Sequence, residues 1–145
     1  MTRQIYKTVT NPLVEFIPKV YQDDKSLDKN APKIADRPLI CMVRKLTREQ
    51  NLNLQSLLDF KPSKDNPTKD TVENFGTAAK YIWEHCVIQV KNVLLNIDGE
   101  DKEFETLEGR DKNALFETKG IDYEIAECIQ FIQSISNLTE VEAKN

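Results

Sequence analysis

The stretch "CVIQVKNVLLNIDGEDKEFET", residues 86–106, decides the fold. It follows a segment whose apolar residues recur at helical spacing, and it is itself rich in β-branched and apolar residues, which favour strands. We therefore predict a change from helix to strand at residues 86–87, with a helix continuing to Val93 as the competing interpretation. Asp98-Gly99 is a strong hairpin signal, so a second strand is expected around 102–106.

Helical patterns precede this stretch. Asp70 followed by Glu73 indicates a helix start, and apolar residues at helical spacing run from Val72 to Cys86. An earlier helix is expected to begin at Thr47, because Gln50 three residues later completes a capping-box pattern. These two segments are the expected central helices.

All six prolines lie in the first 67 residues, and they disfavour long helices there because proline lacks a backbone N–H. "PLVEFIPKVY", residues 12–21, predicts an edge strand, since interior sheet positions reject proline. "PLICMVRKL", residues 38–46, predicts a second strand buried on both faces. The polar residues 22–38 between them predict a β-hairpin with a long loop. A second polar, proline-containing loop is expected at 61–69.

The last stretch, "IDYEIAECIQFIQSISNLTEVEAKN", has apolar residues at steps of three and four, which place them on one side of a helix. We expect an amphipathic helix that ends near Ser136, followed by a short C-terminal tail at 138–145. The apolar side is either part of the core or a surface for a partner, and a domain of this size needs its isoleucines in the core. Contact with a partner is then expected at Phe131, Leu138 and Val141.

The composition indicates one globular α+β domain spanning residues 1–145, with 39% hydrophobic and 30% charged residues. Three cysteines, Cys41, Cys86 and Cys128, are odd in number and far apart, so we predict small buried side chains rather than disulfides. No apolar run approaches the roughly 20 residues that span a bilayer. We therefore expect an intracellular protein that does not bind membranes.

The net charge of −4 is unevenly divided along the chain. Residues 1–67 hold 12 Lys/Arg against 8 Asp/Glu, whereas residues 68–145 hold 8 against 16. This asymmetry favours association of the two halves, or attraction of a basic partner to the second half. No basic cluster is dense enough to predict nucleic-acid binding.

Catalytic and metal-binding patterns are missing from the sequence. The one histidine, His85, is adjacent to Cys86, and adjacent residues point in different directions, so no Cys–His dyad is expected. One His and three scattered Cys do not have zinc-ligand spacing. The acidic residues 98–108 lack the glycine position of a calcium loop, because Gly99 directly follows Asp98. We expect no enzyme, no metal and no cofactor.

Two sets of segments resemble a known family. "LVEFIPK…DRPLICMVRKLTREQ" is similar to the opening of small bacteriophage proteins encoded among the tail genes, where two strands and a polar loop lead into a helix. "NVLLNIDGEDKEFETLEG…LFETKGIDYEIAECIQFIQSISNLTEVEAKN" is similar to their close, with a DG hairpin, an amphipathic helix, a Ser-x-Leu-Thr break and a terminal Glu-x-Lys-Asn. The chain thus resembles the tail assembly chaperones of long-tailed phages.

This resemblance implies a non-enzymatic chaperone that binds the tape measure protein, tail tube subunits or both in the host bacterial cytoplasm during infection. Self-association into a homo-oligomer is left open. Many of these chaperones are mainly helical, whereas strands are expected here. The alternative is therefore a minor structural protein of the virion, such as a head–tail connector or tail-completion component. A host-directed or regulatory binding protein is a third interpretation.

Overall fold

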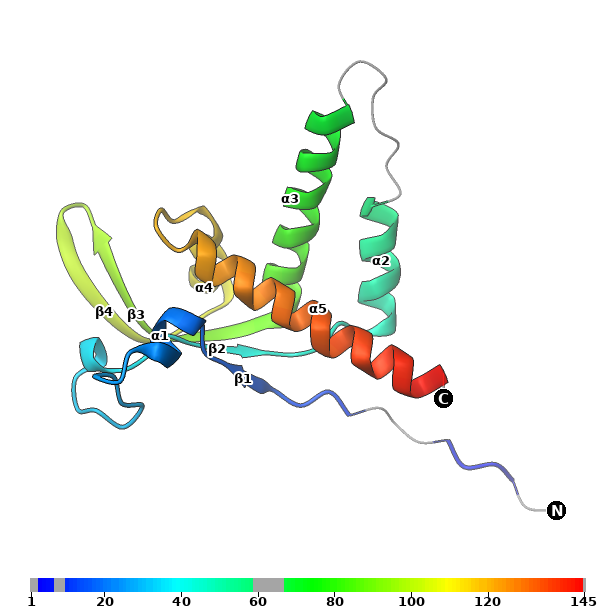
Figure 1. Cartoon of the computed structure of the whole chain (residues 1–145), viewed down its shortest axis with the longest axis horizontal. Helices are drawn as coiled ribbons and strands as arrows, with labels where there is room; N and C mark the ends of the chain where they lie inside the picture. The colour runs from blue at the N-terminus through cyan, green and yellow to red at the C-terminus, as the bar shows by residue number, and fades with distance from the viewer. Residues whose placement is uncertain (1–2, 7–9, 59–66, 145) are drawn as a thin grey trace.

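The computed structural model describes residues 3–6, 10–58 and 67–144, which fold as α+β, as expected. Within them, antiparallel strands form a four-stranded sheet in the order β1-β2-β3-β4, with helices packed against it (Figure 1). The strands are β1 (Val14–Phe16), β2 (Ile40–Val43), β3 (Val87–Ile97) and β4 (Glu100–Glu108). The helices are α1 (Lys19–Asp23), α2 (Arg48–Leu58), α3 (Pro67–Cys86), α4 (Gly109–Ala114) and α5 (Asp122–Lys144), with short 3-10 helices η1 (Ile34–Asp36) and η2 (Leu115–Glu117).

The predicted change from helix to strand is confirmed. α3 ends at Cys86 and β3 begins at Val87, so the competing helix to Val93 is wrong. Cys86 and Val87 are both fully buried, as a junction inside the core requires. Asp98 and Gly99 both have positive φ, 53° and 87°, as in a type I′ turn, which matches the twist of the strands it joins. The predicted hairpin is therefore confirmed too.

β3 belongs to the four-stranded sheet only over its first half. Its pairing with β2 ends at Ile40–Lys91, and the next residue, Asn92, has a φ of 62°. The Asn92 Nδ2 donates a hydrogen bond of 2.9 Å to the carbonyl of Pro38 just before β2. Beyond this point β3 pairs with β4 alone, and the two strands extend past the sheet at one end of the molecule (Figure 1). We call residues 93–104 the hairpin arm.

The expected N-terminal hairpin is present. β1 pairs antiparallel with β2 at the sheet edge, and β2 is buried at Ile40, Cys41 and Val43, so the predicted edge strand and buried strand are both confirmed. The predicted polar loop at 22–38 needs a correction, because α1 extends into it and η1 lies within it.

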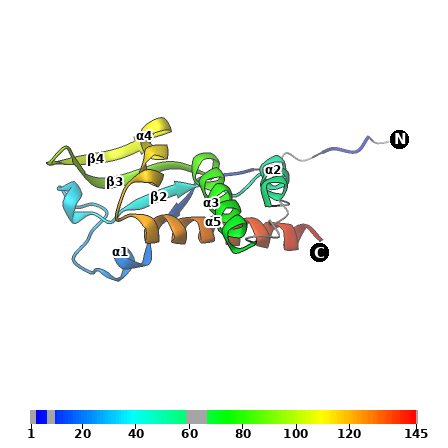
Figure 2. The ribbon, with the colours of Figure 1, turned by 90° about the horizontal axis from the view of Figure 1, so that it is seen from above.

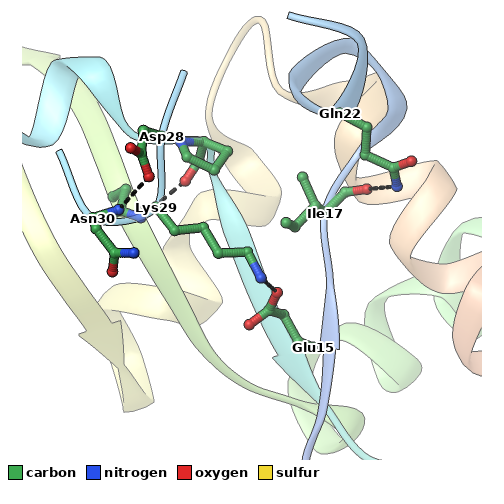
Figure 3. A network of polar contacts seen from close by, with 8 residues as sticks. Glu15, Ile17, Gln22, Asp28, Lys29 and Asn30 are labelled. Carbon is green, nitrogen blue, oxygen red and sulfur yellow. Dashed lines mark hydrogen bonds and ion pairs between the residues drawn. The ribbon is translucent and has the colours of Figure 1, made fainter. Parts of the chain in front are cut away.

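Polar side chains hold this connection against β1, as Figure 3 shows. Lys29 forms an ion pair with Glu15 of β1, and the Gln22 side chain donates to the carbonyl of Ile17. Within the connection, the Asn30 N–H donates to the carboxylate of Asp28 over 2.9 Å. These bonds explain why a segment with few apolar residues still adopts a defined path.

α2 and α3 lie side by side and antiparallel, and they stand away from the sheet (Figures 1 and 2). The capping box of α2 is confirmed, since the Thr47 N–H donates to Gln50 Oε1 (3.0 Å) and the Gln50 N–H donates to Thr47 Oγ1 (3.1 Å). α3 begins at Pro67 rather than Asp70, so the predicted loop is wrong for residues 67–69. Proline suits a first helical position, where its missing N–H has no helical acceptor. The remaining part of that loop, 61–66, lies outside the described residues.

α5 runs across the sheet and contributes its apolar side to the core (Figure 1). The members of that side that are buried are Ile125, Cys128, Ile129 and Ile132. The predicted end near Ser136 is wrong, as is the separate tail at 138–145, because α5 continues to Lys144. No glycine or proline interrupts residues 122–144, so nothing local stops the helix.

The core lies between the sheet and the helices, with Trp83 and Ile82 of α3 among its largest fully buried side chains. Cys41, Cys86 and Cys128 are free and buried in it, which confirms their prediction as small buried side chains.

Candidate functional site

A cavity of about 300 Å³ lies where the β1–β2 connection, β3 and the start of α5 meet. It forms at the point where β3 leaves β2, next to Asn92. Its polar lining comes from Tyr21, Asp24, Arg37, Asn92, Thr118, Lys119 and Glu124, and most of its apolar lining comes from Leu27, Ile34, Leu39, Val93, Leu94, Leu95 and Ile121. We call it the acidic cavity after Asp24 and Glu124, although Arg37 and Lys119 also line it.

Two local structures bring Tyr21 and Glu124 together. α1 starts after Pro18 and docks on α5, where the Lys19 N–H donates to Glu127 Oε2 over 2.9 Å. This contact joins segments 108 residues apart and places Tyr21 beside the first turn of α5. On the other side, Gly120 has a φ of 92°, a conformation that favours glycine, and it turns the chain from η2 into α5.

Glu124 is the chemically unusual group of the cavity. Its Oε2 is buried and has no hydrogen-bond partner among the described residues. Burial raises the pKa of the Tyr21 phenol, and the negative charge of Glu124 raises it further, so this phenol remains a neutral donor and acceptor. A buried carboxylate oxygen without a donor is unfavourable, because it has lost water without a replacement.

Three other charged residues line the cavity, namely Asp24, Arg37 and Lys119, and none of them donates a hydrogen bond to the buried Glu124 oxygen. The Arg37 Nε donates to the carbonyl of Ala31 (2.7 Å), and its Nη1 lies 3.5 Å from Glu105 Oε1 of β4. The Asp24 carboxylate accepts hydrogen bonds from the hydroxyl and N–H of Ser26, which lower its pKa. The cavity is therefore lined by a carboxylate, and one oxygen of that carboxylate is buried without a donor among the described residues.

Exposed apolar side chains occur on the elements that form the cavity. Leu94 lines the cavity and is 53% exposed. Val20 and Tyr123, which precede the lining residues Tyr21 and Glu124, are 59% and 84% exposed. We call Val20, Leu94 and Tyr123 the apolar rim. Exposed large apolar side chains are typical of surfaces that bind other molecules when they form a patch.

The residues predicted to contact a partner lie elsewhere on α5. Phe131 is half-buried and stacks on Phe16 of β1, with ring centroids 4.8 Å apart. Leu138 and Val141 belong to the backbone of α5, but their side chains lie outside the described residues. Phe131 is not part of the cavity lining.

Tyr21 and Glu124 were not among the predicted contact residues. One signal for them was available, because Phe131 lies seven residues after Glu124 and therefore on the same flank of the helix. A phenylalanine there indicates that other elements pack against this flank of α5. In the structure, β1 contacts the flank through Phe16, and α1 contacts it through the Lys19 N–H.

The titratable groups outside the cavity have structural positions. His85 is exposed on α3, with its ring centroid 4.3 Å from that of Tyr81. Burial raises the pKa of the neighbouring Cys86 thiol to about 12, which keeps it protonated and unreactive. Over the described ranges, no group of three or more His, Cys, Asp or Glu side chains is placed to hold a metal ion.

Within residues 3–6, 10–58 and 67–144, no helix combines the length and apolar character needed to cross a bilayer. Comparison with known proteins finds no family model, no curated protein and no solved structure that matches this chain.

Proposed function

We propose that this chain is a non-enzymatic assembly chaperone that binds a partner protein through the acidic cavity and its apolar rim. The observation that carries this proposal is the Glu124 carboxylate in the lining of a cavity, with exposed apolar side chains on the elements that form it. The resemblance to phage tail assembly chaperones supplies the class of partner, namely the tape measure protein or tail tube subunits. The site of action would be the host bacterial cytoplasm.

The chemistry of the cavity favours a basic side chain of the partner. A lysine ammonium or arginine guanidinium carries donors for Glu124, and hydrogen bonds between charged groups are stronger than neutral ones. The apolar stem of either side chain would pack along walls such as Leu39 and Ile121. About 300 Å³ is at the lower end of ligand-site volumes, so the cavity suits one such side chain better than a large cofactor.

The apolar rim extends this contact to the residues around the basic side chain. Tyr123 and Leu94 offer large apolar surfaces that are open to solvent in the free chain. A tape measure segment with apolar residues next to a lysine or arginine would cover both. Transient covering of such a segment is what keeps an unassembled client soluble.

Co-expression with the tape measure protein and the tail tube protein of the same gene cluster tests the proposal. Affinities are then measured by calorimetry for the wild type, Glu124→Gln and Tyr123→Ala. We expect Glu124→Gln to weaken binding roughly tenfold, because it removes one charge-assisted hydrogen bond of about 1.5–3 kcal/mol. Glu117→Gln is the matched control, since Glu117 is exposed outside the cavity. Equal affinities for all variants would contradict the proposed site.

A minor structural role in the virion is the second candidate. It is favoured by the outer edge of β4, with which no strand pairs in the part of the chain that the structure describes, because open edges promote assembly. Quantitative mass spectrometry of purified particles and of lysate from the same infection separates the two functions. A chaperone is abundant in lysate and missing from particles, whereas a structural component has a fixed integer copy number in each particle.

A further inference from the structure

Residues 3–6 form an extended segment that leaves the body of the molecule (Figures 1 and 2). Ile5 is 87% exposed and Tyr6 is 81% exposed, so two large apolar side chains are left without cover. The chain is attached further along, where Asn11 Nδ2 donates to the carbonyl of Lys45 over 3.0 Å. We call residues 3–6 the leading segment, and its exposure raises the question of what covers it.

The outer edge of β4 is a template for such a segment. In the sheet order β4 is the last strand, and no strand of the described chain pairs with its outer side. Ile97 and Glu100 flank the two-residue turn and form a hydrogen-bonded pair, so the pairs alternate from there along the hairpin. The backbone N–H and C=O groups of Asp101, Glu103 and Glu105 therefore point away from β3. An open edge of this length invites another strand.

The charges of the two elements are complementary. β4 has five carboxylates and one lysine over nine residues. One of these carboxylates, Glu105, is paired with Arg37, while Glu103 is exposed and forms no ion pair within the described part of the chain. By contrast, residues 1–13 contain Arg3 and Lys7 and no acidic residue. Ile97 of β3, which is 39% exposed, adds apolar surface beside this edge for the leading segment.

The two elements lie too far apart to meet within one copy. Figure 1 places the leading segment at one end of the long axis and the hairpin arm at the other. A stretch of the length of residues 3–13 spans at most roughly 35 Å when extended, which is about the length of β4. It is therefore long enough to pair along the β4 edge of a neighbouring copy, whereas it points away from the β4 edge of its own copy. From this placement we propose that the leading segment of one copy adds as a strand to the β4 edge of a second copy.

Such contacts join different surfaces of the two copies. In a pair, one copy therefore keeps a free leading segment and the other keeps a free β4 edge. Contacts of this kind generate rings when the rotation closes and filaments when it does not. This inference does not depend on client binding at the acidic cavity, because neither the leading segment nor β4 lines it.

Sedimentation velocity of the full chain over a wide concentration range tests the contact with two variants. Ile5→Asp places a charge in the leading segment, and Glu103→Pro removes an outward N–H from β4 without removing a bond to β3. We expect the wild type to form larger species as its concentration rises, and each variant alone to remain a monomer. An equimolar mixture should form a dimer, because one intact segment and one intact edge remain.

Other outcomes would overturn the proposal. A wild type that stays monomeric at millimolar concentration has no such contact. A mixture that stays monomeric shows that the segment and β4 are not each other's partners. If Ile5→Asp associates as the wild type does, the leading segment is not involved. Far-UV circular dichroism verifies that each variant is folded before its sedimentation is interpreted.

A charge exchange gives an independent check. Arg3→Glu and Glu103→Lys should each weaken association roughly two- to fivefold, as exposed ion pairs do, and their combination in one chain should restore it. Glu117→Lys is the matched control, because it makes the same change of charge at an exposed position away from β4. An equal effect of Glu117→Lys would show that net charge, rather than a specific contact, controls association.

Discussion

Lys112 shows how a single residue can connect two helices. It is 2% exposed, and its Nζ donates to the carbonyls of Trp83 (2.8 Å) and Glu84 (3.2 Å) at the C-terminal end of α3. These carbonyls have no helical partner, and the helix dipole adds negative potential there, so a cation is favourable. In return, the Trp83 indole N–H donates to the carbonyl of Lys112 over 3.1 Å. α4 is therefore fixed to the end of α3.

We expect Lys112→Met to lower the free energy of unfolding by about 1–3 kcal/mol at pH 7, because two buried carbonyls lose their donor. Urea denaturation measures this, with Lys80→Met on the exposed side of α3 as the control. The pH dependence adds a second readout. Burial lowers the pKa of Lys112 from 10.5 to about 8, so between these values the unfolded chain binds more protons and stability rises with pH.

The difference between wild type and Lys112→Met should thus widen by roughly 1 kcal/mol from pH 7 to pH 9. Cys86, whose pKa is raised to about 12, acts in the opposite direction above pH 9, but it is present in both proteins. A difference that stays constant or narrows over this range would mean that Lys112 is not buried as an ammonium.

For Glu124 we expect a substitution to change the free energy of unfolding in the opposite direction. Glu124→Met removes a buried oxygen without a donor and keeps a similar volume, so we expect the free chain to gain about 1 kcal/mol of stability. Glu127→Met is the matched control on the same flank of α5. It should lose about 1 kcal/mol, because Glu127 accepts the Lys19 N–H. Thermal or urea unfolding of both variants measures these changes. A loss of stability in Glu124→Met would show that the Glu124 carboxylate stabilises the folded chain.

At the scale of elements, Asn92 separates the two halves of β3. Its φ of 62° suits asparagine or glycine, and its side chain bonds the Pro38 carbonyl. We expect Asn92→Gly to cost about 1 kcal/mol, for the lost hydrogen bond, and Asn92→Ala to cost about 1 kcal/mol more, because an alanine side chain is strained at positive φ. Urea denaturation of the two variants measures the difference, and equal losses would mean that the backbone relaxes there.

The elements predicted from the sequence are those with local causes. The Thr47–Gln50 capping box and the Asp98-Gly99 turn each involve residues at most three apart, and both are present. The start of α3 was misplaced because Pro67 was interpreted as a helix breaker, although proline is favourable in a first turn.

The acidic cavity was beyond prediction for a different physical reason. It depends on α1 docking against α5, and that contact joins Lys19 and Glu127 across 108 residues. No local pattern fixes such a pair. The sequence showed Glu124 as one of several acidic residues on the polar side of a helix, whereas its missing donor becomes visible only when Tyr21 and Arg37 are placed around it.

At the scale of the whole molecule, α5 connects the N-terminal part of the chain to the rest. Phe131 stacks on Phe16 of β1, Ser136 Oγ accepts the Leu46 N–H over 2.9 Å, and Ile125 to Ile132 enter the core with α3 and the sheet. Elements from both ends of the sequence thus share one core. The single domain expected for residues 1–145 stays a prediction, because part of that range lies outside the described residues.

A single core predicts a single cooperative unfolding transition. Trp83 is the one tryptophan of the chain and is 1% exposed, so its fluorescence reports the core, whereas far-UV circular dichroism reports the helices throughout. We expect the two signals to change together in urea, with the same midpoint and slope. An earlier change in circular dichroism would mean that α2 and the outer part of α3 unfold separately. In that case the chain would contain two cooperative units, and the helix pair would be the part available to rearrange when a partner binds.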